Sequence, residues 1–214
     1  MKSMAAYKYP YRTEAVGFPR CPVQPFKPTT GKHLYYSSAR LLGSKGVWPD
    51  KASKELHIKS MKWLVKNRQY FDKITVALQF DLKTAGLDNF TEYGFEFQEV
   101  GTPAELSTAT AMRQFQDVDV VISFNTFAHL AVANGIPTVI AGKLGEVVNR
   151  HYKLKNCDLY KQWFDFPLDL FAMNGEDLLR LRDRMNPEVE EWKRINIGTS
   201  FDADKFISVV KEFV

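Results

Sequence analysis

The middle of the chain has a pattern of apolar and polar positions that predicts a strand, a helix and a second strand. Residues 118–122 form a short run that is apolar and β-branched apart from Asp119, as is typical of a strand covered on both faces of a parallel sheet. A helix is predicted over residues 126–134, and Gly135 suits the position just after its C-terminal end. A second apolar run follows at residues 138–141. The pattern therefore predicts a β-α-β unit.

Polar side chains gather where the first of these strands ends. Ser123 follows the apolar run, and Asn125 or Thr126 is placed to cap the helix. Ligands of open α/β sheets bind at the carboxyl ends of strands, and helix N-termini favour phosphate. The turn is therefore a candidate phosphate site. A structural crossover with a polar cap explains the same pattern equally well.

The rest of the chain continues the alternation of strands and helices. Further strands are predicted at residues 33–36, 73–78 and 94–100, and further helices at residues 51–67, 176–185, 187–195 and 202–214. Residues 101–105 are predicted to form a turn and N-cap that lead into a helix ending at Phe115. A short polar connection is expected between the strands at 73–78 and 94–100. Five strands separated by helices predict a single Rossmann-like α/β domain with a mostly parallel, doubly wound sheet.

Residues 1–32 differ from the remainder and are interpreted as an extended N-terminal arm, with the domain itself at residues 33–214. Five prolines in this stretch oppose a regular helix, and five aromatic residues favour packing against another surface. A strap over its own domain is favoured over a partner-binding tail. Glu14 is its only acidic residue, so the arm is also basic.

Composition narrows the function classes. The chain has 214 residues, 45% of them hydrophobic and 25% charged, which describes an ordinary globular protein. Its formal net charge of +4 permits anionic ligands, but no dense basic block indicates nucleic acid. No apolar run is long enough to span a membrane. Cys21 and Cys157 have no metal or redox spacing, so we expect reduced thiols in the cytoplasm.

The loop after the strand at 33–36 is the second candidate phosphate-binding segment. It contains Ser37 and Ser38, the cationic residues Arg40 and Lys45, and two glycines. Glycine permits close approach of the backbone, and the two cations are suited to neutralising a diphosphate.

Other candidate site residues carry weaker signals. The Asp-x-Asp pattern of Asp117 and Asp119 has the form of a metal site, but a structural cap is favoured and no metal is expected. His129 and Gly101 are candidate pocket residues because each lies near a predicted strand-to-helix turn. A lone helix histidine is more often structural. Cys157 has no evident base partner in the sequence.

Two segments resemble the C-terminal, donor-nucleotide half of GT-B glycosyltransferases. Residues 34–46 resemble the family's strand and Gly-Arg-Leu…Lys-Gly loop, and residues 130–139 resemble its Glu-Ala…Gly-x-Pro-Val-Val stretch. The resemblance covers most of the chain and implies that Arg40 and Lys45 hold the donor's diphosphate. It also implies that Asn125 and Thr126 contact the phosphates, as a similar turn does in some branches of the family.

The chain departs from the family in three ways. The paired acidic residue that the family has several positions before its second motif is missing, because residues 123–126 here read Ser-Phe-Asn-Thr. Leu130 stands where retaining members have a ribose-binding glutamate, and 32 residues cannot form the usual acceptor-binding domain. The expected function is metal-independent glycosyl transfer from a nucleotide sugar, without a cofactor and with no nominated catalytic residue. A partner chain or a homo-oligomer would complete the acceptor site. The alternative is a non-catalytic nucleotide-sugar-binding or assembly subunit that pairs with a separate acceptor-binding chain.

Overall fold

A computed structural model provides the fold. It describes residues 23–26, 30–37, 51–78, 87–99, 115–123, 127–140, 168–183 and 187–212. The turn predicted at 101–105 and the helix predicted to follow it lie outside these residues, apart from the last position, Phe115.

The described residues contain a single five-stranded sheet in which every pairing is parallel. Its strands are β1 (His33–Ser37), β2 (Lys73–Leu78), β3 (Glu96–Glu99), β4 (Val120–Ser123) and β5 (Thr138–Ile140). Their order in the sheet is β3-β2-β1-β4-β5. All five strands occur where the hydrophobic pattern predicts them, within two residues at each end. The predicted α/β fold with a parallel, Rossmann-like sheet is confirmed.

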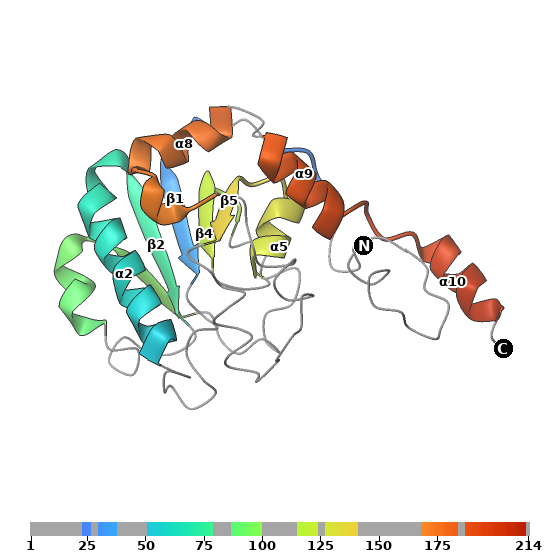
Figure 1. The fold of residues 1–214 in the computed structure, drawn as a ribbon, viewed down its shortest axis with the longest axis horizontal. Helices are drawn as coiled ribbons and strands as arrows, with labels where there is room; N and C mark the ends of the chain where they lie inside the picture. Colours follow the sequence, from blue (N-terminus) through green and yellow to red (C-terminus); the bar gives the residue numbers. More distant parts are fainter. Residues whose placement is uncertain are drawn as a thin grey trace.

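Helices cover both faces of this sheet and continue beyond it (Figure 1). The α-helices are α2 (Lys51–Asn67), α5 (Phe127–Ala133), α8 (Gly175–Asp183), α9 (Pro187–Asn196) and α10 (Ala203–Lys211). The described residues also form the 3-10 helices η1 (Arg68–Tyr70), η2 (Asp88–Tyr93) and η3 (Leu170–Ala172). The sequence predicts a polar loop between β2 and β3, but this connection contains η2. Gly94 follows η2 with a left-handed φ of 68°.

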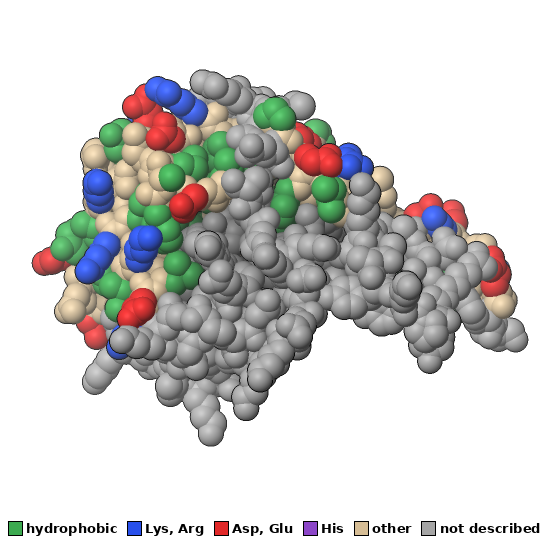
Figure 2. Space-filling model, in the orientation of Figure 1, with side chains coloured by type: hydrophobic (Ala, Val, Ile, Leu, Met, Phe, Trp, Pro, Cys, Tyr) green, Lys and Arg blue, Asp and Glu red, His purple; other side chains and the backbone are tan. Residues whose placement is uncertain are grey.

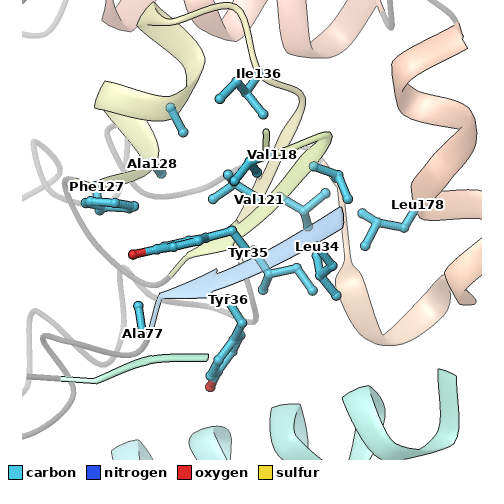
Figure 3. Packing of buried hydrophobic residues seen from close by; sticks show 14 of the residues in the cluster. Leu34, Tyr35, Tyr36, Ala77, Val118, Val121, Phe127, Ala128, Ile136 and Leu178 are labelled. Carbon is cyan, nitrogen blue, oxygen red and sulfur yellow. The ribbon is translucent and has the colours of Figure 1, made fainter. Parts of the chain in front are cut away.

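The core is built by side chains that leave β1 in opposite directions (Figure 3). Tyr36 points toward α2, where its hydroxyl lies 2.7 Å from Nδ1 of His57. Tyr35 points to the opposite face and stacks on Phe127, the first residue of α5. Successive strand residues point to opposite faces, so β1 is buried on both sides, as a doubly wound sheet requires.

Gly135 ends α5 as its sequence position predicts. Its φ is 73°, its N–H donates to the Val132 carbonyl at 3.0 Å, and the Ile136 N–H donates to the Ala131 carbonyl at 3.0 Å. This pair of bonds is the Schellman pattern, in which a left-handed residue satisfies the last carbonyls of a helix.

Residues 23–26 lie across the C-terminal end of α5 and beside α9 (Figure 1). The N–H of Gln24 donates to the Ala133 carbonyl at 2.7 Å, and Nζ of Lys193 donates to the Gln24 carbonyl at 2.7 Å. The N–H of Val23 donates to Oγ of Ser200 at 2.8 Å. These four residues pack against the domain. The wider interpretation of residues 1–32 as a strap stays a prediction.

Figure 2 shows basic and acidic side chains interspersed over the displayed surface of α2 and α8. Such a mixed surface agrees with the modest net charge of the whole chain. None of the helices in the described residues has the length and apolar character needed to cross a bilayer.

Candidate functional site

The strand order places a topological switch point between β1 and β4. From β1 the chain continues to β2 on one side of the sheet centre, whereas from β4 it continues to β5 on the other side. The two connections therefore diverge at the carboxyl ends of β1 and β4. In open α/β sheets this divergence leaves a crevice in which ligands bind.

Ser37 and Ser123 are the last residues of these two strands and are paired in the sheet register. Register partners on parallel neighbours point to the same face, which here is the face that carries Tyr35 and α5. Ser37 is 2% exposed and Ser123 is fully buried. Their hydroxyl groups are therefore adjacent polar groups at the end of two otherwise apolar strands. The sequence indicates Ser37 as a site residue but Ser123 only as a neighbour of the turn, because only the register brings the two together.

Three aromatic rings pack together on the face of the sheet that carries Ser37 and Ser123. Tyr35 stacks on Phe127 with ring centroids 5.6 Å apart and meets Phe115 edge-on at 6.0 Å. The Phe115 and Phe127 rings are 4.8 Å apart. Burial raises the pKa of the Tyr35 hydroxyl, so the ring stays neutral at physiological pH. Because Phe127 begins α5, the three rings set the start of that helix relative to β1.

Most of the other predicted site residues lie outside the described part of the chain. This group comprises Ser38, Arg40, Lys45, Gly101, Asn125 and Thr126. Their roles stay predictions based on sequence.

His129 is described and lies between two helices. It is 9% exposed on α5, and its ring centroid is 5.2 Å from that of Trp192 on α9. This contact is a packing contact between α5 and α9. The assignment of His129 to a pocket stays a prediction.

Asp117 and Asp119 lie at the opposite, amino-terminal edge of the sheet. Oδ2 of Asp119 accepts a hydrogen bond from the His33 N–H at 2.7 Å, and the Asp119 N–H donates to the His33 carbonyl at 3.0 Å. Asp119 thus ties the start of β1 to the segment before β4, which is the structural role that the sequence favoured. Within the described residues, no three histidine, cysteine or acidic side chains converge as a metal site.

His33 completes this amino-terminal network, which the sequence pattern does not indicate. Nδ1 lies 2.8 Å from the Asp117 carbonyl and Nε2 lies 2.9 Å from Oγ1 of Thr75. A carbonyl only accepts, so Nδ1 donates to it, and the neutral ring then accepts from the threonine hydroxyl. Desolvation is the largest effect on the pKa of His33 and lowers it, which favours this neutral form. No local sequence signal identifies the network, because its members come from three separate segments.

Comparisons with known proteins give one weak structural similarity. No family model matches the chain, and no curated protein matches it. Among solved structures, the chain is similar to the wall teichoic acid polymerase TagF, with 11% sequence identity and a TM-score of 0.29. The similarity covers 77% of this chain and 43% of the polymerase, so the chain spans less than half of that protein's length. A TM-score this low does not demonstrate a shared fold, and the fold assignment depends on the parallel sheet itself.

Proposed function

We propose that this chain is the donor-nucleotide-binding unit of a GT-B-type glycosyltransferase. The observation that carries the proposal is the buried pair Ser37 and Ser123 at the switch point between β1 and β4. Hydroxyl groups at this edge suit the phosphate or ribose oxygens of a nucleotide. The resemblance of residues 34–46 and 130–139 to the donor half of the family supports the same ligand class.

The cations that follow β1 in the sequence supply the charge for this ligand. Arg40 is the third residue after Ser37, and Lys45 is the eighth. In glycosyl transfer the anomeric carbon leaves the diphosphate oxygen and bonds to an acceptor oxygen, which gives up its proton. Arg40 and Lys45 stabilise the negative charge on the departing diphosphate. Asn125 and Thr126, which follow β4 in the sequence, contact the phosphates as well.

A non-catalytic nucleotide-sugar-binding subunit is the second candidate, and Leu130 favours it. This residue stands at the position of the ribose-binding glutamate of retaining enzymes, and its side chain is only 7% exposed within the hydrophobic core. It therefore packs and cannot accept hydrogen bonds from a ribose. Either candidate requires a separate chain or domain for the acceptor.

Alanine substitution of the two serines tests the site itself. Thermal shift with a panel of nucleoside diphosphates and nucleotide sugars identifies a ligand, which at 100 times its Kd adds about 2.7 kcal/mol of stability. In calorimetric titration, Ser37→Ala and Ser123→Ala should each weaken binding by about 0.5–1.5 kcal/mol through the loss of one hydrogen bond. Ser60→Ala is the matched control, because Ser60 is also buried but donates to the Leu56 carbonyl within α2. Binding that is unchanged in both edge variants would place the ligand elsewhere.

Charge substitutions test the flanking loops in the same titration. Arg40→Ala should weaken binding by roughly 1.5–3 kcal/mol, whereas Lys54→Ala on the exposed side of α2 should leave it unchanged. Asn125→Asp places a negative charge against the phosphates and should abolish binding while the fold is retained. Full binding by Asn125→Asp would contradict the proposed site.

Nucleoside diphosphate release distinguishes the two candidates. A transferase supplied with a nucleotide sugar, an acceptor and its acceptor-binding chain releases nucleoside diphosphate and glycosylates the acceptor. Binding without release under those conditions would favour the non-catalytic subunit.

A further inference from the structure

Helix α10 presents large apolar side chains to solvent. Phe206, Ile207 and Val210 are 47%, 48% and 43% exposed, and no residue of the helix is buried. Phe201, just before the helix, is 40% exposed, and its ring centroid is 5.7 Å from that of Phe206. Figure 1 shows α10 extending away from the sheet beyond α9. Contiguous apolar exposure of this kind marks an interaction surface.

The apolar side chains of α10 form one continuous stripe. Ala203, Phe206, Ile207 and Val210 recur at the i, i+3, i+4 and i+7 spacing that places residues on one helix face. Figure 2 shows acidic and basic side chains on the displayed side of α10, so the helix is amphipathic. A helix of this type docks its apolar face against another apolar surface.

The charges of α10 disfavour an anionic membrane as that surface. Between residues 202 and 212 there are three acidic residues, Asp202, Asp204 and Glu212, and two basic ones, Lys205 and Lys211. Helices that lie on membranes are rich in lysine and arginine on their polar face and are attracted to anionic lipids. An excess of acidic residues gives α10 no such attraction.

We propose that α10 docks against α10 of a second copy of this chain in an antiparallel, two-fold pair. Charge complementarity along one flank of the stripe favours this partner. Asp204 and Lys211 are seven residues apart, so they lie on the same flank, two helical turns from each other. In a two-fold antiparallel pair the same flank of each helix faces its counterpart.

The sequence of α10 gives this pairing a definite register. With the two-fold axis between Ile207 and Ser208, Asp204 of each copy lies level with Lys211 of the other, because both residues are equally far from the axis. The same register brings the two copies of Ile207 together and sets Phe206 close to Val210 of the other copy. A single register therefore provides both the apolar contacts and two Asp204–Lys211 pairs.

The size of the stripe sets the expected strength of the pair. Phe201 and the three large side chains of the stripe, Phe206, Ile207 and Val210, are each less than half exposed. Together they supply at most about 400 Å² per copy, since a buried aromatic side chain covers about 150–250 Å². This area is about half of the roughly 800 Å² per partner in a standard interface. The pair should therefore form reversibly and depend on protein concentration.

Sedimentation velocity of the full chain over a range of micromolar concentrations tests the pairing without any nucleotide. The wild-type chain should show a concentration-dependent monomer–dimer equilibrium. Ile207→Asp places a charge in the stripe and should raise the dimer dissociation constant at least about tenfold. Ser208→Asp is the matched control, because it adds the same charge outside the stripe and should leave the equilibrium nearly unchanged. Unchanged melting temperatures confirm that both variants remain folded.

Charge reversal tests the register. Asp204→Lys and Lys211→Asp should each weaken the dimer, and the double variant should restore it, because every opposite-charge pair is then re-formed in reverse. Circular dichroism controls for loss of helix, since reversing these charges also opposes the helix dipole.

Several outcomes would overturn the proposal. These are a wild-type chain that stays monomeric at every concentration, a dimer that persists in Ile207→Asp, and a double variant that does not recover. Monomeric chain that floats with phosphatidylglycerol–phosphatidylcholine vesicles would show a membrane as the occupant instead.

Discussion

At the scale of single residues, Gly135 ties the end of a helix to a segment more than a hundred positions earlier in the chain. Its φ of 73° is in the left-handed region that closes α5, and a Cβ added there would lie 2.0 Å from the Pro25 carbonyl oxygen. The backbone conformation and the approach of residues 23–26 both require glycine. Only the first requirement can be read from the sequence.

Gly135→Ala should therefore destabilise the protein for two separable reasons. The left-handed conformation costs about 1–2 kcal/mol for a residue with a Cβ, and the contact with Pro25 adds to this cost. Gly94→Ala is the matched control, because Gly94 has a φ of 68° but nothing within 4 Å of the added Cβ. Urea unfolding should show a larger loss for Gly135→Ala than for Gly94→Ala. Equal losses would mean that residues 23–26 do not press on the helix end in solution.

At the scale of elements, α5 is held at both ends by segments distant in sequence. Phe127 at its start packs on Tyr35 and Phe115, and the Ala133 carbonyl at its end accepts from Gln24. Seven residues make too short a helix to be stable alone, so these contacts determine that it forms. The helix that follows the switch point therefore depends on tertiary packing.

The contact of α9 with residues 23–26 is centred on Lys193. Its side chain is 7% exposed, Nζ donates to the Gln24 carbonyl, and Nζ also lies 4.4 Å from the centroid of the Phe26 ring. Lys193→Met keeps most of the side-chain volume but removes the charge-assisted bond. The free energy of unfolding should fall by about 1–2 kcal/mol, and the Gln24 amide should exchange faster with deuterium.

Lys62→Met, on the exposed side of α2, is the control for removing a positive charge. Its effect on the free energy of unfolding should stay within about 0.5 kcal/mol. Equal stability and equal Gln24 exchange in wild type and Lys193→Met would show that the lysine does not hold this segment.

At the scale of the whole molecule, the buried His57 links stability to pH. The ring is fully buried beneath β1, and desolvation lowers its pKa from 6.5 to about 3. Below pH 6.5 the unfolded chain binds a proton at His57 that the folded chain does not bind. The contribution of His57 to the free energy of unfolding is therefore fully present above pH 6.5 and is lost as the pH falls toward 3.

His57→Gln should flatten this part of the stability profile. The wild-type free energy of unfolding should fall more steeply below pH 6.5 than that of the variant, by up to about 1.4 kcal/mol per pH unit. Urea unfolding at a series of pH values gives the slope of the free energy of unfolding against pH for each protein. His33 is present in both proteins, so its contribution cancels in the comparison. Coincident slopes would show that His57 is protonated in the folded state.

The sequence by itself determined where the strands and most of the α-helices lie along the chain. The strands, the helix Lys51–Asn67 and the glycine after α5 depend on local sterics and on the pattern of apolar positions, both of which are visible in neighbouring residues. Alternating strands and helices also implied a parallel sheet, because parallel strands need crossover connections. The candidate loops after β1 and β4 were identified from residue type alone.

Only the tertiary structure decided which of these residues meet. Ser37 and Ser123 are register partners because β4 pairs with β1, and no local pattern specifies which strand becomes a neighbour. The same reason applies to His33 with Thr75, to Tyr36 with His57 and to Lys193 with Gln24. Contacts between distant segments depend on the strand order and on the free energy of burying the whole core, so they become visible only when the chain is folded.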